Sequence, residues 1–158
     1  MSERFKPLST VALIIEHNGK YLIVEENNED QNDRPVFSMP AGHVEAKESI
    51  IEAALREGRE ETGCEVKLLS LIGIYEYVKD YETIYRFCFE AKIDNVPENM
   101  RSADPDLEIK AVKWYSKEEI YERKADWRTR LVGTNFDDYF AGRKLPLDVI
   151  STINTVSK

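Results

Sequence analysis

The chain has 158 residues, of which 42% are hydrophobic, and its formal net charge at pH 7 is −8. This length and apolar content predict one globular domain over residues 1–158 and exclude a disordered chain. The negative charge argues against general nucleic-acid binding, which needs a basic face, and it means that a phosphorylated substrate is repelled unless metal ions bridge it.

No segment has the pattern of a membrane span or an export signal. The longest uninterrupted apolar run, residues 11–15, is far shorter than the roughly 20 residues that cross a bilayer. The first residues, MSERFKPLST, lack the apolar centre of a secretory signal. Cys64 and Cys88 lie in apolar patterns without C-x-x-C spacing, so we expect core thiols rather than a disulfide or a metal pair. These features predict a cytoplasmic protein without membrane contact.

Apolar and β-branched runs predict the strands. The expected extended segments are, in chain order, residues 10–15, 21–25, 36–44, 64–78, 82–93 and 109–115. Asn18-Gly19, between the first two segments, is a strong signal for a hairpin turn. Polar stretches at 26–34 and 94–106 predict loops.

Three segments predict helices. The first begins at Ser49, which opens a capping-box pattern, and ends near Gly63. A short helix follows from Ser116, and a longer one begins at a cap on Asp126 and ends at Gly142. Strands and helices in this order predict an α/β organisation.

The first predicted helix carries a concentration of glutamates. Glu57, Glu60 and Glu61 are related as i, i+3 and i+4, so they project from one face and span about 6 Å along the axis. Like charges at this spacing weaken an isolated helix, and a hard divalent cation with oxygen ligands is the natural compensation. The alternative is an ordinary solvated acidic face.

The spacing around these glutamates is specific. The stretch GHVEAKESIIEAALREGREETGC contains G-x5-E-x7-R-E-x-x-E-E-x-G, which resembles the signature of the Nudix hydrolases. The resemblance implies a mixed β-sheet sandwiched between α-helices, and the hydrolysis of a small-molecule phosphoanhydride with bound Mg²⁺, or Mn²⁺ as a substitute. It also implies metal-ligand roles for Glu57, Glu60 and Glu61 and supporting roles for Arg56 and Glu48. A plain surface ion pair is the alternative for the last two.

One position departs from the family pattern, which usually has an aliphatic residue where this chain has Gly58. On a helix Gly58 falls in the middle of the inward stripe formed by Ile51, Ala54, Leu55 and Thr62. Glycine there costs about 1 kcal/mol in helix propensity relative to alanine, and it leaves space that a larger side chain would fill. We expect an aromatic ring from the 75–89 segment to occupy that space and the carboxylates to lie on the other face.

Residues next to the signature supply further candidates. Gly42 lacks a Cβ, so the loop before the helix can approach the helix and the metal site closely. His43 is either a proton carrier or a structural histidine, and the structural role is the more common. We expect a base or a further metal ligand at Glu108, which follows a loop and starts a strand. The alternatives are Asp104, Asp106 and Glu82.

Segments outside the signature bear on the substrate. The chain resembles one bacterial Nudix subfamily at residues 5–7, 40–46, 86–89, 114, 116–120, 130–132 and 146–150. The phosphatases of that subfamily release orthophosphate from thiamine-related diphosphates and from nucleoside di- and triphosphates. Six aromatic residues could supply a stacking surface for a ring: Phe37, Tyr75, Tyr77, Tyr81, Tyr85 and Trp127. We expect one or two of them to contact the substrate, and we choose Phe37 and Tyr77. Arg86, Arg128 and Arg130 could reach a terminal phosphate, and we choose Arg86 and Arg128. The alternative for each is a core or surface role.

Two other functions stay open. One is a Nudix pyrophosphatase that acts on a nucleotide sugar, a dinucleoside polyphosphate or a damaged nucleotide, because the signature handles only the shared diphosphate. The other is a non-enzymatic module that binds a nucleotide or metabolite, which the presence of every charged signature residue disfavours. The sequence does not decide between a monomer and a homodimer.

Overall fold

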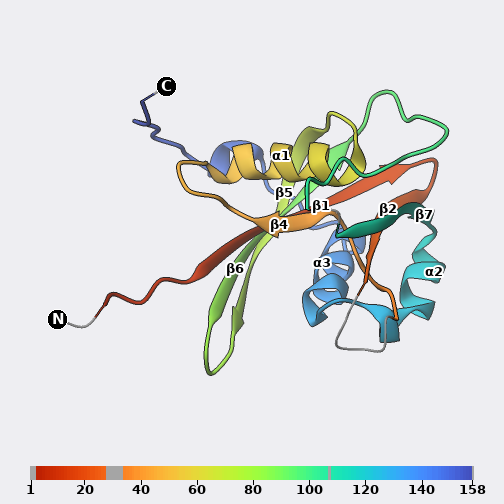
Figure 1. The fold of residues 1–158 in the computed structure, drawn as a ribbon, viewed down its shortest axis with the longest axis horizontal. Coiled ribbons are helices and arrows are strands. Elements are labelled where there is room, and N and C mark those ends of the chain that lie inside the picture. The colour runs from red at the N-terminus through yellow and green to blue at the C-terminus, as the bar shows by residue number, and fades with distance from the viewer. Residues whose placement is uncertain (1–2, 28–33, 107, 158) are drawn as a thin grey trace.

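The computed structural model describes residues 3–27, 34–106 and 108–157. Within them, seven strands form one mixed sheet with helices on both sides (Figure 1). The strands are β1 (Leu8–His17), β2 (Lys20–Glu26), β3 (Val36–Ser38), β4 (Ala41–His43), β5 (Lys67–Val78), β6 (Thr83–Lys92) and β7 (Ile109–Tyr115). The helices are α1 (Ile50–Thr62), α2 (Lys117–Glu122) and α3 (Arg130–Phe140), with 3₁₀ turns η2 (Lys124–Asp126) and η3 (Leu147–Val149).

Strand β1 lies at the centre of the sheet. The order β3-β2-β1-β6-β5 places it between β2 and β6, while β4 also pairs with β1, and β7 pairs with β2. Strand β1 runs parallel to β6 and antiparallel to β2 and β4. The β1–β2 hairpin turns at Asn18 and Gly19, whose φ angles are 52° and 76°. A two-residue type I′ turn requires this left-handed pair, so the predicted hairpin is confirmed.

Strand β1 is buried on both faces from Val11 to Ile15, which explains its continuous apolar run. Successive side chains of a strand point to opposite faces. Leu13 therefore packs in the same cluster as Ala54 of α1, while Ile14 packs in the cluster that contains Phe136 of α3. In Figure 1, α1 lies on one side of the sheet and α3 on the other. The expected sheet between helices is confirmed.

Helix α1 has well-defined ends. Ser49 precedes it with an extended backbone (φ −79°, ψ 165°), and its hydroxyl oxygen accepts a hydrogen bond from the Glu52 N–H at 3.1 Å. Gly63 ends it at φ 72°, where its N–H donates to the Arg59 carbonyl at 2.9 Å. These are the predicted limits, and they fix where the glutamates of α1 lie relative to β4.

Two predicted boundaries are wrong. Strand β5 begins at Lys67 rather than at residue 64. Helix α3 is capped by Thr129, whose hydroxyl accepts from the Leu131 N–H at 3.1 Å, and not by Asp126. Asp126 belongs to η2, and the extended Trp127 (φ −62°, ψ 132°) separates that turn from α3. The predicted loop 26–34 lies mostly outside the described residues.

The expectation about Gly58 is also wrong. A Cβ at this position would lie 2.5 Å from Val66 Cγ2 and 2.9 Å from Leu13 Cδ1, so there is no spare space and no aromatic ring fills it. Glycine instead lets β1 and the segment after α1 pack directly against the helix. Glu57, Glu60 and Glu61 line one cleft, in which Glu61 is buried against β4.

The remaining predictions concern the thiols and the membrane. Cys88 is buried and Cys64 is partly buried, and neither forms a disulfide. Burial raises the pKa of the Cys88 thiol to about 12, so it stays protonated at neutral pH. Among the helices in the part of the chain that the structure describes, none is long and apolar enough to span a bilayer.

Candidate active site

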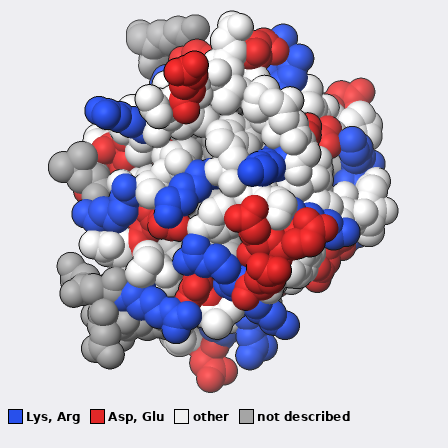
Figure 2. Space-filling view, turned by 90° about the vertical axis from the view of Figure 1, so that its right-hand side faces the viewer, with Lys and Arg blue, Asp and Glu red and all other residues white. Residues whose placement is uncertain are grey.

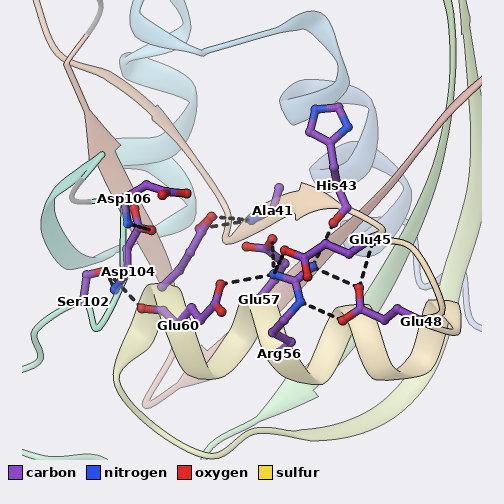
Figure 3. Close-up of polar contacts among 11 residues, drawn as sticks. Ala41, His43, Glu45, Glu48, Arg56, Glu57, Glu60, Ser102, Asp104 and Asp106 are labelled. Carbon is purple, nitrogen blue, oxygen red and sulfur yellow. Dashed lines mark hydrogen bonds and ion pairs between the residues drawn. The ribbon is translucent and has the colours of Figure 1, made fainter.

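Arg56 lies at the centre of the polar cluster on α1 (Figure 3). Its Nε donates to Glu48 Oε2 at 2.7 Å, and its Nη2 donates to Glu48 Oε1 at 3.0 Å. Its Nη1 donates to Glu57 Oε1 at 2.8 Å and to Glu60 Oε2 at 3.1 Å. The fifth contact runs from Nη2 to the His43 carbonyl at 2.9 Å. One guanidinium therefore holds three carboxylates and the end of β4 in place.

This cluster is not a plain surface ion pair. The side chains of Arg56 and Glu48 are only 14% and 13% exposed. The hydrogen bond from Arg56 lowers the pKa of Glu48, and the hydrogen bond to Glu48 raises the pKa of Arg56. Both groups therefore stay charged throughout the physiological pH range.

Gly42 allows the backbone of β4 to touch the helix. A Cβ at this position would lie 2.1 Å from Glu57 Oε1, inside the carboxylate itself. Burial raises the pKa of Glu57 to about 7, even though Arg56 acts to lower it. The close approach therefore keeps water away from a carboxylate that Arg56 neutralises only in part.

Glu61 is the most buried carboxylate of the site, with 5% exposure. It accepts a hydrogen bond from the Ala41 N–H at 3.2 Å. Burial raises its pKa well above the ordinary value, and the charges of Glu57 and Glu26 raise it further. Sequence reasoning missed Glu26, which is itself buried and has a raised pKa for the same main reason. The sequence signal that could have identified Glu26 is a charged residue at the end of the apolar strand β2.

These residues open into one acidic cleft of about 300 Å³. Its carboxylates belong to Glu26, Glu45, Glu57, Glu60, Glu61, Asp104, Asp106 and Glu108, and its guanidinium groups to Arg56 and Arg128. We use the name acidic cleft for this set. Figure 2 shows acidic side chains gathered in a patch on one face, with Lys and Arg side chains beside it.

The segment after Met100 brings three of the four candidate bases to the cleft. The Ala103 N–H donates to the Glu60 carbonyl at 2.7 Å, which ties the segment to α1. Asp104 accepts hydrogen bonds from the backbone N–H groups of Asp106 and Glu108, each at 3.0 Å. Glu82 lies elsewhere, at the β5–β6 turn, where it pairs with Lys79 at 2.9 Å. The structure therefore does not bring Glu82 to the site.

His43 presents its backbone rather than its ring to the cluster. Its carbonyl binds Arg56, while the ring points away from the labelled carboxylates (Figure 3). The side chain is exposed to solvent. This geometry favours the structural role for His43.

The structure places the four side chains that we expected to contact the substrate in different surroundings. Phe37 is 1% exposed, and its ring packs edge-on against Tyr115 with centroids 5.6 Å apart, so the core and not a ligand surrounds it. The structure therefore places Phe37 in the core cluster that includes Phe136 of α3, and its contact with a substrate stays a prediction. Arg128 lines the acidic cleft and pairs with Glu26 at 2.9 Å. Tyr77 lines a neighbouring pocket to which Arg128 also contributes.

Arg86 is a buried arginine with spare hydrogen-bonding capacity. It is 9% exposed, and its Nε donates to Thr10 Oγ1 at 3.3 Å. Its Nη1 is buried and has no hydrogen-bond partner among the residues that the structure describes. Burial lowers the pKa of Arg86, and Cys88, Arg128 and Glu61 lie close enough to shift it. An unpaired buried donor of this kind suits an anionic ligand.

The donors of the cleft fit a hard divalent cation. Carboxylate oxygens are the ligands that Mg²⁺ prefers. Burial raises the pKa of Glu57 and of Glu61, and neighbouring carboxylates raise both further. Within the described residues no three such groups are arranged as a ready-made cage. Their oxygens contact Arg56 and the Ala41 N–H instead. A cation would therefore have to draw these side chains together.

Comparisons with known proteins agree with this geometry. The profile of the NUDIX domain matches residues 6–133. Phosphatase NudJ of Escherichia coli (strain K12) is 33% identical over 151 residues, which cover 95% of this chain and 94% of that protein. A solved NUDIX hydrolase from Nitrosomonas europaea is 36% identical with a TM-score of 0.84, covering 96% of this chain and all of that one.

A more distant structure shares the fold. The E. coli ORF135 protein superimposes with a TM-score of 0.67 at 24% identity, over 87% of this chain and 91% of that one. At that identity the likeness concerns the fold alone. Nudix hydrolases generally use divalent metal ions and act on small phosphate-containing molecules. The signature on α1, the fold and the identity along nearly the whole chain together show that this protein belongs to the Nudix hydrolase family and is a phosphoanhydride hydrolase.

Proposed function

We propose that this Nudix hydrolase is a Mg²⁺-dependent cytoplasmic phosphatase. Its substrates would be thiamine-related diphosphates and nucleoside di- and triphosphates, from which it would release orthophosphate. The carrying observation is the acidic cleft, in which the buried Glu61 and the partly buried Glu57 lie with Arg128. The similarity to a protein named as a phosphatase, across 95% of this chain, supports the choice among Nudix activities.

In this proposal Glu57, Glu60 and Glu61 hold the cation. Mg²⁺ suits them as a hard ion with oxygen ligands, and Mn²⁺ would be a substitute. The bound ion would neutralise the phosphate charge and lower the pKa of a water molecule. Arg56, anchored by Glu48, keeps the carboxylates in position, while Gly42 lets the β4 backbone close one side of the cleft.

The remaining steps fall to other residues of the cleft. Glu108 is our choice as the base that accepts a proton from the attacking water, since it lines the cleft and Asp104 holds its backbone. Asp104 is already occupied by two backbone N–H groups, and Asp106 is the alternative. Arg86 and Arg128 would bind substrate phosphates, because both carry guanidinium groups near Glu61.

The test is product identity across a substrate panel with Mg²⁺. The panel holds thiamine diphosphate, a hydroxymethylpyrimidine diphosphate, nucleoside di- and triphosphates and ADP-ribose, with Glu61→Gln as the blank. Orthophosphate from the first three classes is the expected result. Pyrophosphate or a nucleoside monophosphate from ADP-ribose or triphosphates would move the protein to a Nudix pyrophosphatase activity. No product above the blank would favour a non-enzymatic binding module.

A further inference from the structure

A second pocket lies next to the acidic cleft and has the opposite charge. It has a volume of about 780 Å³ and lies between the end of β5 and helix α3. We call it the basic pocket and define it by Tyr77, Lys79, Lys124, Trp127, Arg128 and Arg130. Its one lining carboxylate, Asp137, accepts the Tyr121 hydroxyl at 2.6 Å. On a protein with a formal charge of −8, such a pocket favours an anionic ligand.

The cations of the basic pocket are not all engaged. Lys79 pairs with Glu82 at 2.9 Å, and Arg128 pairs with Glu26 at 2.9 Å. Lys124 and Arg130 are exposed, and they have no ion-pair partner among the described residues. These two side chains are therefore available to a phosphate group.

Arg128 joins the two sites, because it lines both of them. Its backbone N–H donates to the Phe37 carbonyl at 3.0 Å, and its guanidinium contacts Glu26, so both ends of the residue are held. A ligand that extends across Arg128 would have one end among the carboxylates and the other end in the basic pocket. Two neighbouring phosphates of one substrate would match this alternation of charge, because the carboxylates would hold a cation for the first phosphate and protein cations would bind the second.

Trp127 gives the basic pocket a fixed aromatic surface. Its indole Nε1 donates to the Ile120 carbonyl at 2.9 Å. The ring packs on α3 so closely that a Cβ at Gly133 would lie 2.4 Å from Cζ3. Tyr121 packs edge-on against it with centroids 5.8 Å apart. A ring that is held on several sides loses little freedom when a flat ligand packs on it.

We propose that the basic pocket binds the leaving group of a diphosphate substrate as an organic monophosphate, with its ring against Trp127 and its phosphate among Lys124, Arg128 and Arg130. This inference rests on the proposed phosphatase function and adds which end of the substrate lies in which of the two sites. Cations and an aromatic surface in one pocket fit a group that carries both a phosphate and a ring. The terminal phosphate is then the one that lies in the acidic cleft.

This direction fixes which bond breaks. The water oxygen bonds to the terminal phosphorus, and the bond between that phosphorus and the bridging oxygen breaks. The electron pair stays on the bridging oxygen, which leaves as part of the organic monophosphate. The proton of the water passes to a carboxylate of the cleft, and orthophosphate carries the water oxygen away.

Hydrolysis of uridine diphosphate in ¹⁸O-labelled water with Mg²⁺ tests the direction. Attack at either phosphorus yields the same two products, so only the position of the label distinguishes them. We expect ¹⁸O in orthophosphate and none in uridine monophosphate, measured by mass spectrometry. Label in the monophosphate would place the inner phosphorus in the acidic cleft and overturn the proposal. An absence of hydrolysis would count against the proposed function. Measurements of monophosphate binding would then test the basic pocket by themselves.

Binding is measured by calorimetry on the full chain with EDTA, which removes metal-bridged contacts in the acidic cleft. The probes are uridine monophosphate, uridine and orthophosphate. We expect the monophosphate to bind more tightly than uridine or orthophosphate alone. Lys124→Gln with Arg130→Gln should weaken its binding about fivefold or more, from the loss of two exposed charge contacts. The matched control is Lys67→Gln with Lys92→Gln, which removes the same charge beside Asp94, away from both sites. Equal affinities of the two double variants would overturn the proposal.

Discussion

The metal-free protein should lose stability between pH 5 and pH 8 because of Glu57. Burial raises the pKa of this carboxyl from an ordinary value of 4.5 to about 7. The folded protein therefore holds the proton more tightly than the unfolded chain does. The resulting stabilisation is complete below about pH 4.5 and is lost as the pH rises through about 7.

The size of the effect follows from the shift. At about 1.36 kcal/mol for each pKa unit, the change is worth at most about 3 kcal/mol in the free energy of unfolding. The Glu57 side chain is 13% exposed in a cleft that opens to water, so solvent screening reduces this value. We expect about 1–2 kcal/mol. The charge of Glu57 also raises the pKa of Glu61. Replacing Glu57 with glutamine should therefore reduce the contribution of both carboxyl groups to the pH dependence of stability.

The assay is urea unfolding of EDTA-treated wild type and Glu57→Gln at pH 5 and pH 8. Groups remote from Glu57 affect both proteins alike, so the difference between their two pH dependences reports the carboxylates of the cleft. The control is Glu76→Gln, which removes an exposed glutamate and should behave as the wild type does. Mg²⁺ at pH 8 should stabilise the wild type more than Glu57→Gln. Equal pH dependences in the wild type and Glu57→Gln would refute the reasoning.

Further predictions concern single side chains. Glu61→Gln should abolish most phosphate release while the circular dichroism spectrum stays unchanged, and unchanged turnover would exclude a metal-ligand role. Glu108→Gln should lower kcat by about 100-fold or more, and a loss below tenfold in a steady-state assay would place the base elsewhere. Gly42→Ala should lower kcat, since its Cβ would lie 2.1 Å from a Glu57 oxygen, and a melting curve checks that the fold persists. Gly58→Ala should destabilise the wild type by about 1 kcal/mol in urea unfolding, and it should destabilise Val66→Ala less, because that background removes the contact with Val66 and keeps only the one with Leu13 Cδ1 at 2.9 Å.

Local signals were enough for most of the fold. The limits of α1 follow from Ser49 and Gly63, and the first hairpin follows from Asn18-Gly19, because each of these residues acts on its own backbone. The start of α3 was misplaced because Asp126 and Thr129 are both good caps, and only the extended Trp127 between them decides which is used. That conformation depends on tertiary contacts, including the hydrogen bond from Trp127 to Ile120.

The candidate site likewise has a part that follows from local sequence and a part that depends on tertiary contacts. The residues of the signature lie on one helix, so their mutual spacing is local, and the structure brings Arg56, Glu57 and Glu60 together. The burial of Glu61 depends on β4, and the presence of Glu26 depends on β2, and neither can be read from the helix alone. The burial of Phe37 could not be predicted, because an aromatic residue on a short strand has the same sequence pattern whether it faces a ligand or the core.

The contacts of Arg56 explain how Glu57 and Glu60 can exchange a hydrogen bond to the guanidinium for a bound cation. Its Nε and Nη2 are committed to Glu48 and to the His43 carbonyl, which belong to the loop and to β4. Only Nη1 reaches Glu57 and Glu60. These two carboxylates can therefore turn toward a cation while the guanidinium stays where Glu48 and β4 hold it. A lysine at this position could not divide its contacts in this way, since its single ammonium group lacks the planar fork of donors.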